Sequence, residues 1–372
     1  MGETMKLNVT QENLAKAVGT VGRIVSSRSS LPVLSNILVS TDTNRLRLSA
    51  TNLEIGITYW IGCKVEQEGS VTAPARLFGE FVQNLPAGNL EIVANETNIT
   101  ITTPHYNSQI NGISAEEFPL IPAVKSEPAV TLPADRFRQA LSEVVIAASA
   151  DENRPVLAGV YMYIKEGKLI LVTTDSYRLA ERAITLPKNH TGELSVVVPA
   201  RTMQELVRIL ADNDGDVRMY LADNQVMFQL DSIELVSRLI EGQFPNYQQI
   251  IPQEEKTVAT LPTAELARIT KMANLFAREN AGSIKIEVQA EGEIRIMSSA
   301  SQVGENTSSA ECEVAGDDGE ISLNARYLSD ALTVIKTKQV SFAMSGKLNP
   351  CVLRPEGEGA DDYLHIIMPL RT

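Results

Sequence analysis

A cluster of polar side chains is the first candidate for chemistry in this sequence. Asp175, Ser176, Tyr177 and Arg178 follow one another, and carboxylates, hydroxyls and cations held together can perform acid/base work. The apolar stretch 169–172 comes directly before them. A turn at the end of a strand therefore explains the cluster better, with Asp175 and Ser176 bonded to the local backbone and Arg178 held by a carboxylate. An enzyme that uses these four residues remains an alternative.

Motifs of nucleophilic or metal catalysis are otherwise absent from the sequence. It contains no G-x-x-x-x-G-K-[ST] phosphate loop, no H-E-x-x-H pair and no G-x-S-x-G elbow. Asp214-Gly215-Asp216 lacks the later ligands of a calcium loop and predicts a turn. We expect no metal site, no cofactor and no disulfide, because the histidines and cysteines are few and scattered. They are His105, His190, His365, Cys63, Cys312 and Cys351.

A threefold pattern supplies the elements that would position functional side chains. An alanine-arginine pair recurs with its arginines 125 and 125 residues apart, at Arg76, Arg201 and Arg326. Each pair opens a series of apolar residues at helical spacing, which predicts an amphipathic helix of about three turns. Repetition at a fixed period indicates a chain built from similar structural units.

A second helix is predicted in each third of the chain, over residues 10–25, 132–147 and 261–276. Thr10 and Thr263 are the expected N-caps of the first and the third of these. Short alternating stretches predict half-buried strands between the helices. These stretches are residues 45–50, 98–103, 168–173, 225–230, 283–288 and 293–298.

Proline-bearing segments close each period, at Phe118-Pro119, Phe244-Pro245 and Met368-Pro369. Short polar stretches follow the first two, as expected of linkers. The sequence therefore predicts an α+β protein of three similar domains, over residues 1–125, 126–254 and 255–372, each with two helices packed on antiparallel sheets.

Composition and charge narrow the class of function. With 44% hydrophobic and 21% charged residues, the chain is globular, and it has no apolar run long enough for a membrane span. We expect a cytoplasmic protein with no membrane partner. The six predicted helices together carry +6, so the rest of a chain with net charge −13 carries −19. A surface lined by these helices could hold a phosphate backbone while the acidic exterior repels it. Solvated arginines with local partners are the alternative.

The chain resembles the family of bacterial sliding clamps, the beta subunits of DNA polymerase III. The resemblance covers essentially the whole sequence. It is carried by Leu-Pro-Val-Leu-Ser-Asn-Ile at 31–37, the run 174–180, Gly-Gln-Phe-Pro-Asn-Tyr at 242–247 and Met-Pro-Leu-Arg at 368–371. It implies the DNA clamp fold and a head-to-tail homodimer that closes into a ring of six domains. Such a ring slides on double-stranded DNA without sequence specificity and has no catalytic activity.

The resemblance also implies partners and binding residues. Clamps bind the catalytic subunit of DNA polymerase III, the clamp loader, and other polymerases and mismatch-repair proteins that carry Gln-Leu-x-Leu/Phe type motifs. DNA contacts are expected at Arg28, Arg76 and Arg201, with Arg326, Lys336 and Lys338 added from the repeat and the charge count. The motif pocket is expected at Leu157, Thr174, Tyr177, Arg178, Leu179, Pro245, Ile250, Asn349, Pro350, Met368, Pro369, Leu370 and Arg371.

The dimer interface is the last expectation. The family pairs an edge strand of the first domain with the third domain of the other subunit, which points to Ile110 in the strand near residues 106–113 and to Leu275 and Phe276. Two alternatives stay open. The apolar pocket residues could form ordinary interdomain core, and the repeats could build an adaptor that never encircles DNA.

Overall fold

The computed structural model describes residues 4–25, 31–124, 126–151, 153–187, 192–302, 304–357 and 362–371. Its contacts divide the chain into two compact units. The N-terminal unit comprises residues 1–134 and 209–239, and the C-terminal unit comprises residues 135–208 and 240–372. The central third of the sequence therefore contributes to both units.

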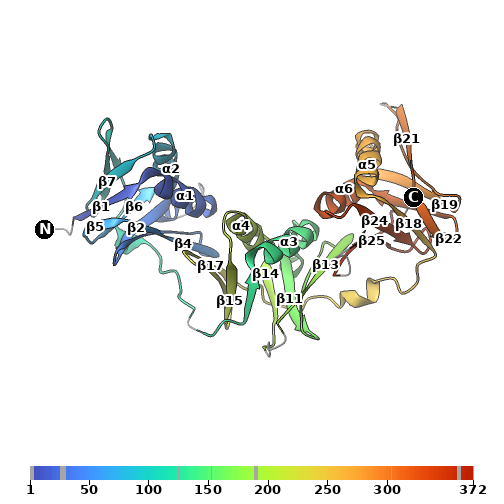
Figure 1. Cartoon of the computed structure of the whole chain (residues 1–372), viewed down its shortest axis with the longest axis horizontal. Coiled ribbons are helices and arrows are strands. Elements are labelled where there is room, and N and C mark those ends of the chain that lie inside the picture. The colour runs from blue at the N-terminus through green and yellow to red at the C-terminus, as the bar shows by residue number, and fades with distance from the viewer. Residues whose placement is uncertain are drawn as a thin grey trace. The chain divides into compact units, whose positions relative to one another are not determined.

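Six α-helices lie in the described ranges, at the positions that the apolar spacing predicts. They are α1 (Gln11–Val21), α2 (Ala75–Asn84), α3 (Ala134–Val144), α4 (Ala200–Ala211), α5 (Thr263–Ala277) and α6 (Ala325–Val334). Figure 1 shows α1 beside α2 in the N-terminal unit and α5 beside α6 in the C-terminal unit. The two helices predicted for each third of the chain are thus confirmed.

The two expected N-caps differ from the prediction. Thr10 is the N-cap of α1, but its side chain makes no capping hydrogen bond. Thr263 is not a cap, because Pro262 holds that position and the Thr263 hydroxyl donates instead to the Thr337 carbonyl at 2.8 Å. Helix α6 has the predicted length of about three turns and ends at Val334, since the following residue is extended and buried.

The N-terminal unit contains two antiparallel sheets. The five-stranded sheet has the order β5-β1-β7-β8-β9, and the eight-stranded sheet has the order β10-β15-β16-β17-β4-β3-β2-β6. The first is built from β1 (Met5–Thr10), β5 (Lys64–Gln67), β7 (Asn89–Ala94), β8 (Asn98–Thr102) and β9 (Asn107–Asn111). The second is built from β2 (Asn36–Asp42), β3 (Arg45–Thr51), β4 (Ile55–Gly62), β6 (Ser70–Pro74), β10 (Val130–Pro133), β15 (Asp216–Ala222), β16 (Gln225–Leu230) and β17 (Ile233–Arg238).

The C-terminal unit also contains two antiparallel sheets. The nine-stranded sheet has the order β14-β11-β12-β13-β26-β25-β24-β18-β22, and the four-stranded sheet has the order β21-β20-β19-β23. The first is built from β11 (Gly159–Lys165), β12 (Lys168–Thr174), β13 (Arg178–Thr185), β14 (Ser195–Pro199), β18 (Thr257–Pro262), β22 (Glu313–Gly316), β24 (Gln339–Met344), β25 (Cys351–Glu356) and β26 (Tyr363–Ile367). The second is built from β19 (Ser283–Gln289), β20 (Glu293–Ala300), β21 (Gly304–Glu311) and β23 (Gly319–Asn324).

Both large sheets continue across the expected domain boundaries. Strand β17 of the central third pairs with β4 of the first, and β13 of the central third pairs with β26 of the last. Local periodicity carries no information on these pairings, which join residues far apart in the sequence. The boundaries after residues 125 and 254 therefore stay predictions.

Apolar packing joins the helices to the sheets. In the N-terminal unit Leu14 and Val18 of α1 and Phe78 and Val82 of α2 are fully buried. Each such side chain stabilises the fold by about 1.5 to 3 kcal/mol through removal of apolar surface from water. The opposite sides of both helices stay polar and accessible, which leaves charged residues free to act.

Candidate nucleic-acid and peptide sites

The three repeated arginines occupy equivalent positions on three helices. Arg76, Arg201 and Arg326 are each the second residue of their helix, in α2, α4 and α6, and each is exposed. Glu80 pairs with Arg76 at 2.9 Å, and Asp330 lies 4.0 Å from Arg326. No carboxylate lies within 4.0 Å of Arg201 in the ranges that the structure describes. Exposed pairs of this kind hold their partners weakly, so all three cations can meet a phosphate.

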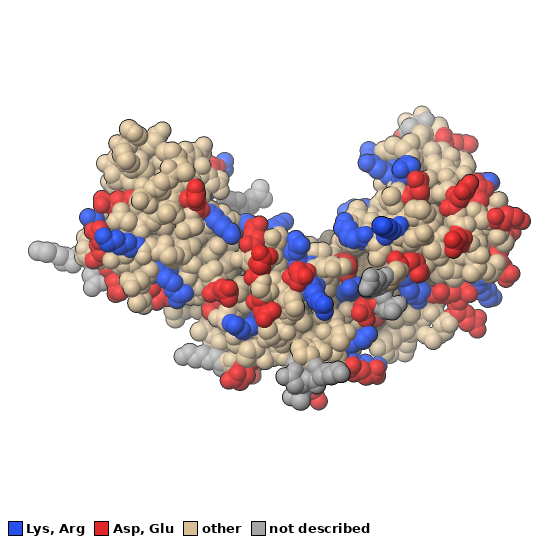
Figure 2. Space-filling model, viewed as in Figure 1, with Lys and Arg blue, Asp and Glu red and all other residues tan. Residues whose placement is uncertain are grey.

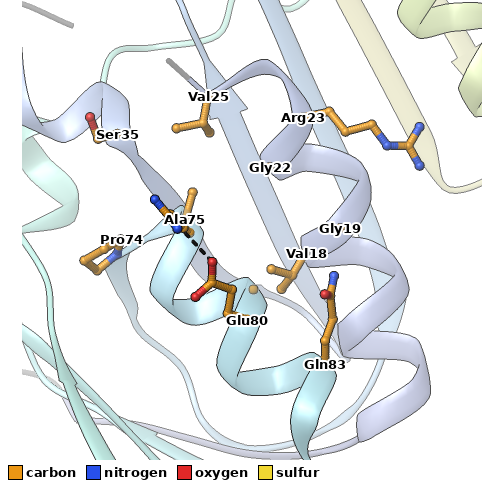
Figure 3. A pocket seen from close by; sticks show the side chains of 12 residues that line it. Val18, Gly19, Gly22, Arg23, Val25, Ser35, Pro74, Ala75, Glu80 and Gln83 are labelled. Carbon is orange, nitrogen blue, oxygen red and sulfur yellow. Dashed lines mark hydrogen bonds and ion pairs between the residues drawn. The ribbon is translucent and has the colours of Figure 1, made fainter. Parts of the chain in front are cut away.

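A cleft of about 680 Å³ lies between α1 and α2 beside Arg76. Arg23, from the turn after α1, and Gln83 of α2 line it together with the Arg76–Glu80 pair, which Figure 3 draws as a dashed line. Helix α2 and the turn after α1 therefore present polar, hydrogen-bonding groups to one hollow. Arg23 was counted in the charge of the first helix but not chosen as a site residue, because no motif marks it.

The other predicted DNA contacts fall in two different settings. Lys336 and Lys338 are exposed but lie after the end of α6, and the Lys336 ammonium donates to the Thr333 carbonyl at 2.6 Å. On the face shown in Figure 2, basic side chains gather over α5 and α6 while acidic ones spread over the strands of the same unit. Arg28 lies outside the described residues.

The polar cluster forms a turn between β12 and β13. The Asp175 carboxylate accepts the backbone N–H groups of Tyr177 and Arg178 at 2.9 and 3.0 Å, and the Thr174 hydroxyl donates to the Arg178 carbonyl at 2.7 Å. Ser176 has a positive φ of 80° and accepts from the Arg154 guanidinium. These bonds commit the side chains to holding the turn, which agrees with the structural interpretation and leaves the catalytic one without a free base.

Arg178 joins this turn to helix α6. Its guanidinium lies 3.1 Å from Asp175 and 2.6 Å from Asp330, and it stacks over the Tyr327 ring at 4.5 Å. The carboxylate partner was predicted, but Asp330 and Tyr327 were not, because both lie about 150 residues along the chain. Arg178 is only 8% exposed, so it offers little surface to a ligand.

The segment before β18 supplies Pro245 and Ile250, which are both exposed. Aromatic rings fix it to the outer face of the nine-stranded sheet, because Phe244 stacks on Tyr161 at 4.9 Å. The Tyr247 hydroxyl donates to the Glu181 carboxylate and accepts from the Tyr163 hydroxyl at 2.7 Å. Burial raises the pKa of the Glu181 carboxyl and that of the Tyr247 hydroxyl.

The C-terminal segment completes this region of the C-terminal unit. Backbone hydrogen bonds of 2.8 Å fix it, from the Met368 N–H to the Tyr177 carbonyl and from the Leu370 N–H to the Ser322 carbonyl. Most of the remaining pocket residues are accessible: Tyr177, Asn349 and Arg371 are exposed, and Leu157, Pro350, Met368, Pro369 and Leu370 are half-buried.

Leu179 and Thr174 correct the predicted pocket lining. Leu179 is fully buried and packs in a core cluster with Phe244, Tyr247 and Ile366. Thr174 is 7% exposed and bonded within its own turn. Both therefore lie beneath the surface expected to form the pocket, and the burial of Leu179 agrees with the alternative of an ordinary core residue.

The three residues expected at the dimer interface differ in their exposure to solvent. Strand β9 is an edge of its sheet, as predicted, but Ile110 points inward and is only 5% exposed. Leu275 is exposed and Phe276 half-buried on α5. Strand β21 is an edge of the four-stranded sheet next to α5, and it is not among the elements expected at the dimer interface. Its burial alternates weakly, which gives it little signal in the sequence.

Among the described residues no group of three or more histidine, cysteine or acidic side chains is placed to hold a metal ion. The three cysteines are free thiols. In the described part of the chain, no helix is both long and apolar enough to span a membrane.

Comparison with known proteins identifies the family. Models of the DNA polymerase III beta subunit match residues 5–122 with the N-terminal domain, 131–246 with the central domain and 248–371 with the C-terminal domain. The predicted fold of three clamp domains is thereby confirmed. The match leaves only short segments of the chain unassigned.

Individual relatives agree over their full length. The beta sliding clamp of Bacillus subtilis (strain 168) is 29% identical over 379 residues, which cover 99% of this chain and 100% of the relative. A crystal structure of the DNA polymerase sliding clamp from Bacillus subtilis has a TM-score of 0.93 at 28% identity and covers 99% of both chains. The DNA polymerase III beta chain from Streptococcus pneumoniae TIGR4 has a TM-score of 0.92 at 27% identity, over 99% of this chain and 100% of that one. The chain belongs to the DNA polymerase III beta subunit family, the bacterial beta sliding clamps.

Proposed function

We propose that this sliding clamp closes as a head-to-tail dimer around double-stranded DNA and holds it through the exposed cations of its six helices. The repeated arginine carries the proposal, because Arg76, Arg201 and Arg326 take the same exposed place at the start of three helices. Phosphate contacts from such residues are independent of sequence. A ring needs only weak contacts of this kind, since enclosure keeps it on the duplex while it slides.

Retention on circular DNA tests enclosure. The clamp, loaded onto a nicked circular duplex by a clamp loader, should stay bound at high salt and leave when the circle is cut. Loss from the intact circle at the same rate would favour an adaptor that never encircles DNA. For an enzyme that does not encircle DNA, binding should not depend on whether the circle is intact or cut.

Charge reversal tests the helices. Arg201→Glu should weaken loading and reduce the salt dependence of DNA binding by about one phosphate contact per subunit. Arg76→Glu should have a smaller effect, because Glu80 already neutralises part of that charge. Arg218→Glu, the same change at an exposed position of strand β15, is the control. Equal effects at Arg201 and Arg218 would place the DNA elsewhere.

The second proposed activity is peptide binding in the C-terminal unit. Tyr177, Pro245, Ile250, Met368 and Leu370 offer an accessible apolar set around the turn held by Arg178. Burying two apolar anchors at about 1.5 to 3 kcal/mol each, less the cost of ordering a flexible peptide, gives roughly micromolar affinity. The proposed ligands are Gln-Leu-x-Leu/Phe motifs of the DNA polymerase III catalytic subunit, the clamp loader, other polymerases and mismatch-repair proteins.

Ile250→Asp tests this pocket without disturbing the core, because the side chain is 38% exposed. It should reduce motif-peptide affinity at least tenfold, since it places a charge where an apolar anchor is buried. Removal of residues 368–372 should abolish binding while the dimer persists. Leu77→Asp, at an exposed apolar position of α2, should leave peptide binding unchanged. Unaltered affinity in the first two variants would refute the pocket.

Ring closure is proposed to pair β9 of one copy with β21 of the other, because both are sheet edges in the described residues. Leu275 would pack beside this junction. A solution mass of one subunit at micromolar concentration would contradict it. A cytoplasmic location remains a prediction.

A further inference from the structure

The two large sheets share one framework, so their residues can be matched by register. In the N-terminal unit Leu38, Ser49, Thr58 and Glu234 lie across β2, β3, β4 and β17 in one row. In the C-terminal unit the corresponding row across β11, β12, β13 and β26 is Tyr161, Val172, Glu181 and Leu364. The next row matches Ser40, Arg47 and Trp60 with Tyr163, Ile170 and Ala183.

The turns at the ends of these strands confirm the match. Thr51 accepts the Leu53 N–H and donates to the Ile55 carbonyl, as Thr174 does with Ser176 and Arg178. Asn52 caps the Glu54 and Ile55 N–H groups as Asp175 caps its own pair. Leu53 has a φ of 74°, close to the 80° of Ser176. The N-terminal unit thus carries a copy of the turn that shapes the proposed motif pocket.

The outer faces above these rows are filled differently. In the C-terminal unit the rings of Tyr161 and Tyr163 fill the space beneath the segment that carries Phe244 and Tyr247. In the N-terminal unit the corresponding segment, residues 118–123, crosses the smaller Leu38 and Ser40. A groove of about 410 Å³ remains there between segment and sheet. That volume is within the range of ligand sites, about 300 to 1,000 Å³.

The charge of the groove differs as well. Arg47 stands where the other sheet has Ile170, and Thr58 stands where it has the acidic Glu181. Glu234 lines the groove at its β17 side, two strands from Arg47, where the other sheet has Leu364. The Arg47 guanidinium donates to Ser40 at 3.0 Å and has no carboxylate within 4.0 Å among the residues described. The groove therefore offers space for a ring and, beside it, a cation that favours an acidic group.

The groove continues toward the copied turn. A second cavity of about 180 Å³, lined by Leu53, Ile55 and Arg238, shares the segment 119–122 with it. Leu120 on that segment is 95% exposed and Leu53 is 49% exposed. An elongated site with two exposed leucines suits an extended chain better than a compact metabolite.

We propose that this groove binds an extended segment of a partner protein in which an aromatic residue stands next to an acidic one. The ring occupies the space that Tyr161 and Tyr163 fill in the other sheet, and the carboxylate pairs with Arg47. An apolar residue that follows would lie against Leu120. This site is separate from the motif pocket and from the DNA-facing helices.

Trp60 supplies the readout, because it is the only tryptophan of the chain and lines the groove. The blocked tripeptide acetyl-Asp-Tyr-Leu-amide, titrated into the full-length clamp, should change its tryptophan fluorescence saturably. The matched peptides acetyl-Lys-Tyr-Leu-amide and acetyl-Asp-Ala-Leu-amide should bind at least about tenfold more weakly, since each loses one of the two recognised groups. Equal binding by all three peptides, or none at millimolar concentration, would overturn the proposal.

Two variants test whether the change in tryptophan fluorescence comes from peptide bound in this groove. Ser40→Tyr restores the ring of the other sheet and should abolish binding, with Leu38→Tyr as a second choice if the first folds poorly. Arg47→Gln should remove the preference for the acidic over the lysine peptide. If free 4-hydroxyphenylacetate binds as tightly as the tripeptide, the ligand of the groove is a small aromatic acid, and the proposal of a protein partner is wrong. Motif-peptide affinity at the other pocket, measured in parallel, should stay constant in every variant, so failure here is distinct from failure of the proposed function.

Discussion

Replacement of Arg178 by methionine tests whether one buried guanidinium holds the proposed peptide pocket together. Arg178→Met keeps an apolar chain of similar length but removes the charge that Asp175 and Asp330 share. Breaking a buried ion pair at one partner costs about 3 to 5 kcal/mol. Asp330 is about one third exposed and regains water, which favours the lower end, while the lost stacking on Tyr327 adds about 1 kcal/mol. We expect a local loss of about 3 to 4 kcal/mol.

Native-state hydrogen exchange measures this loss where it arises. Arg178 pairs in register with Ile367, so the amides of β13 and β26 should lose roughly 10²- to 10³-fold of protection. Arg268→Met is the matched control, because its pair with Glu265 on α5 is exposed and worth about 1 kcal/mol or less. A fall in protection below tenfold in Arg178→Met, or an equal fall in the control, would refute the assigned role.

Three further outcomes follow from buried groups and close contacts. Burial raises the pKa of the Glu181 carboxyl above 4.5. Its contribution to the free energy of unfolding is therefore complete below that pH and is lost as the pH rises through the raised value. Glu181→Gln should reduce this loss of stability, measured as the urea midpoint at a series of pH values. Burial lowers the pKa of His365 from 6.5 to about 3, so stability present above pH 6.5 is lost as the pH falls, and His365→Phe should remove that part of the acid sensitivity in the same titration. Gly112→Ala would place a methyl group 1.7 Å from the Thr72 carbonyl oxygen and should lower the melting temperature through a loss of about 1 to 3 kcal/mol, whereas Gly62→Ala, with nothing within 4 Å, should leave it unchanged.

Local order was predictable from the sequence and distant pairing was not. Apolar spacing located all six described helices, and alternation located six of the strands, β3, β8, β12, β16, β19 and β20, because both depend on neighbours a few residues apart. The continuous sheets, the Asp330 partner of Arg178 and the burial of Leu179 and Ile110 depend on chains that meet after long separations. The motif-pocket residues that the resemblance implies stay a prediction, and the resemblance could not say which of them face solvent.

Comparison of the two large sheets separates what the fold requires from what a binding site requires. The threonine followed by Asn52 or Asp175, and the positive φ two residues after each threonine, recur with the same hydrogen bonds. Without those bonds a non-glycine residue with positive φ costs about 1 to 3 kcal/mol, so this part of the framework cannot vary freely. The outward-facing residues have no such constraint, and they differ in size or in charge at every matched position named above. Any difference in what the two turns bind must therefore come from the outer-face side chains and the segment that crosses them. For this reason Ser40→Tyr, which introduces the residue found at the matched position of the other sheet, is expected to close the groove of the N-terminal unit without disturbing the proposed motif pocket.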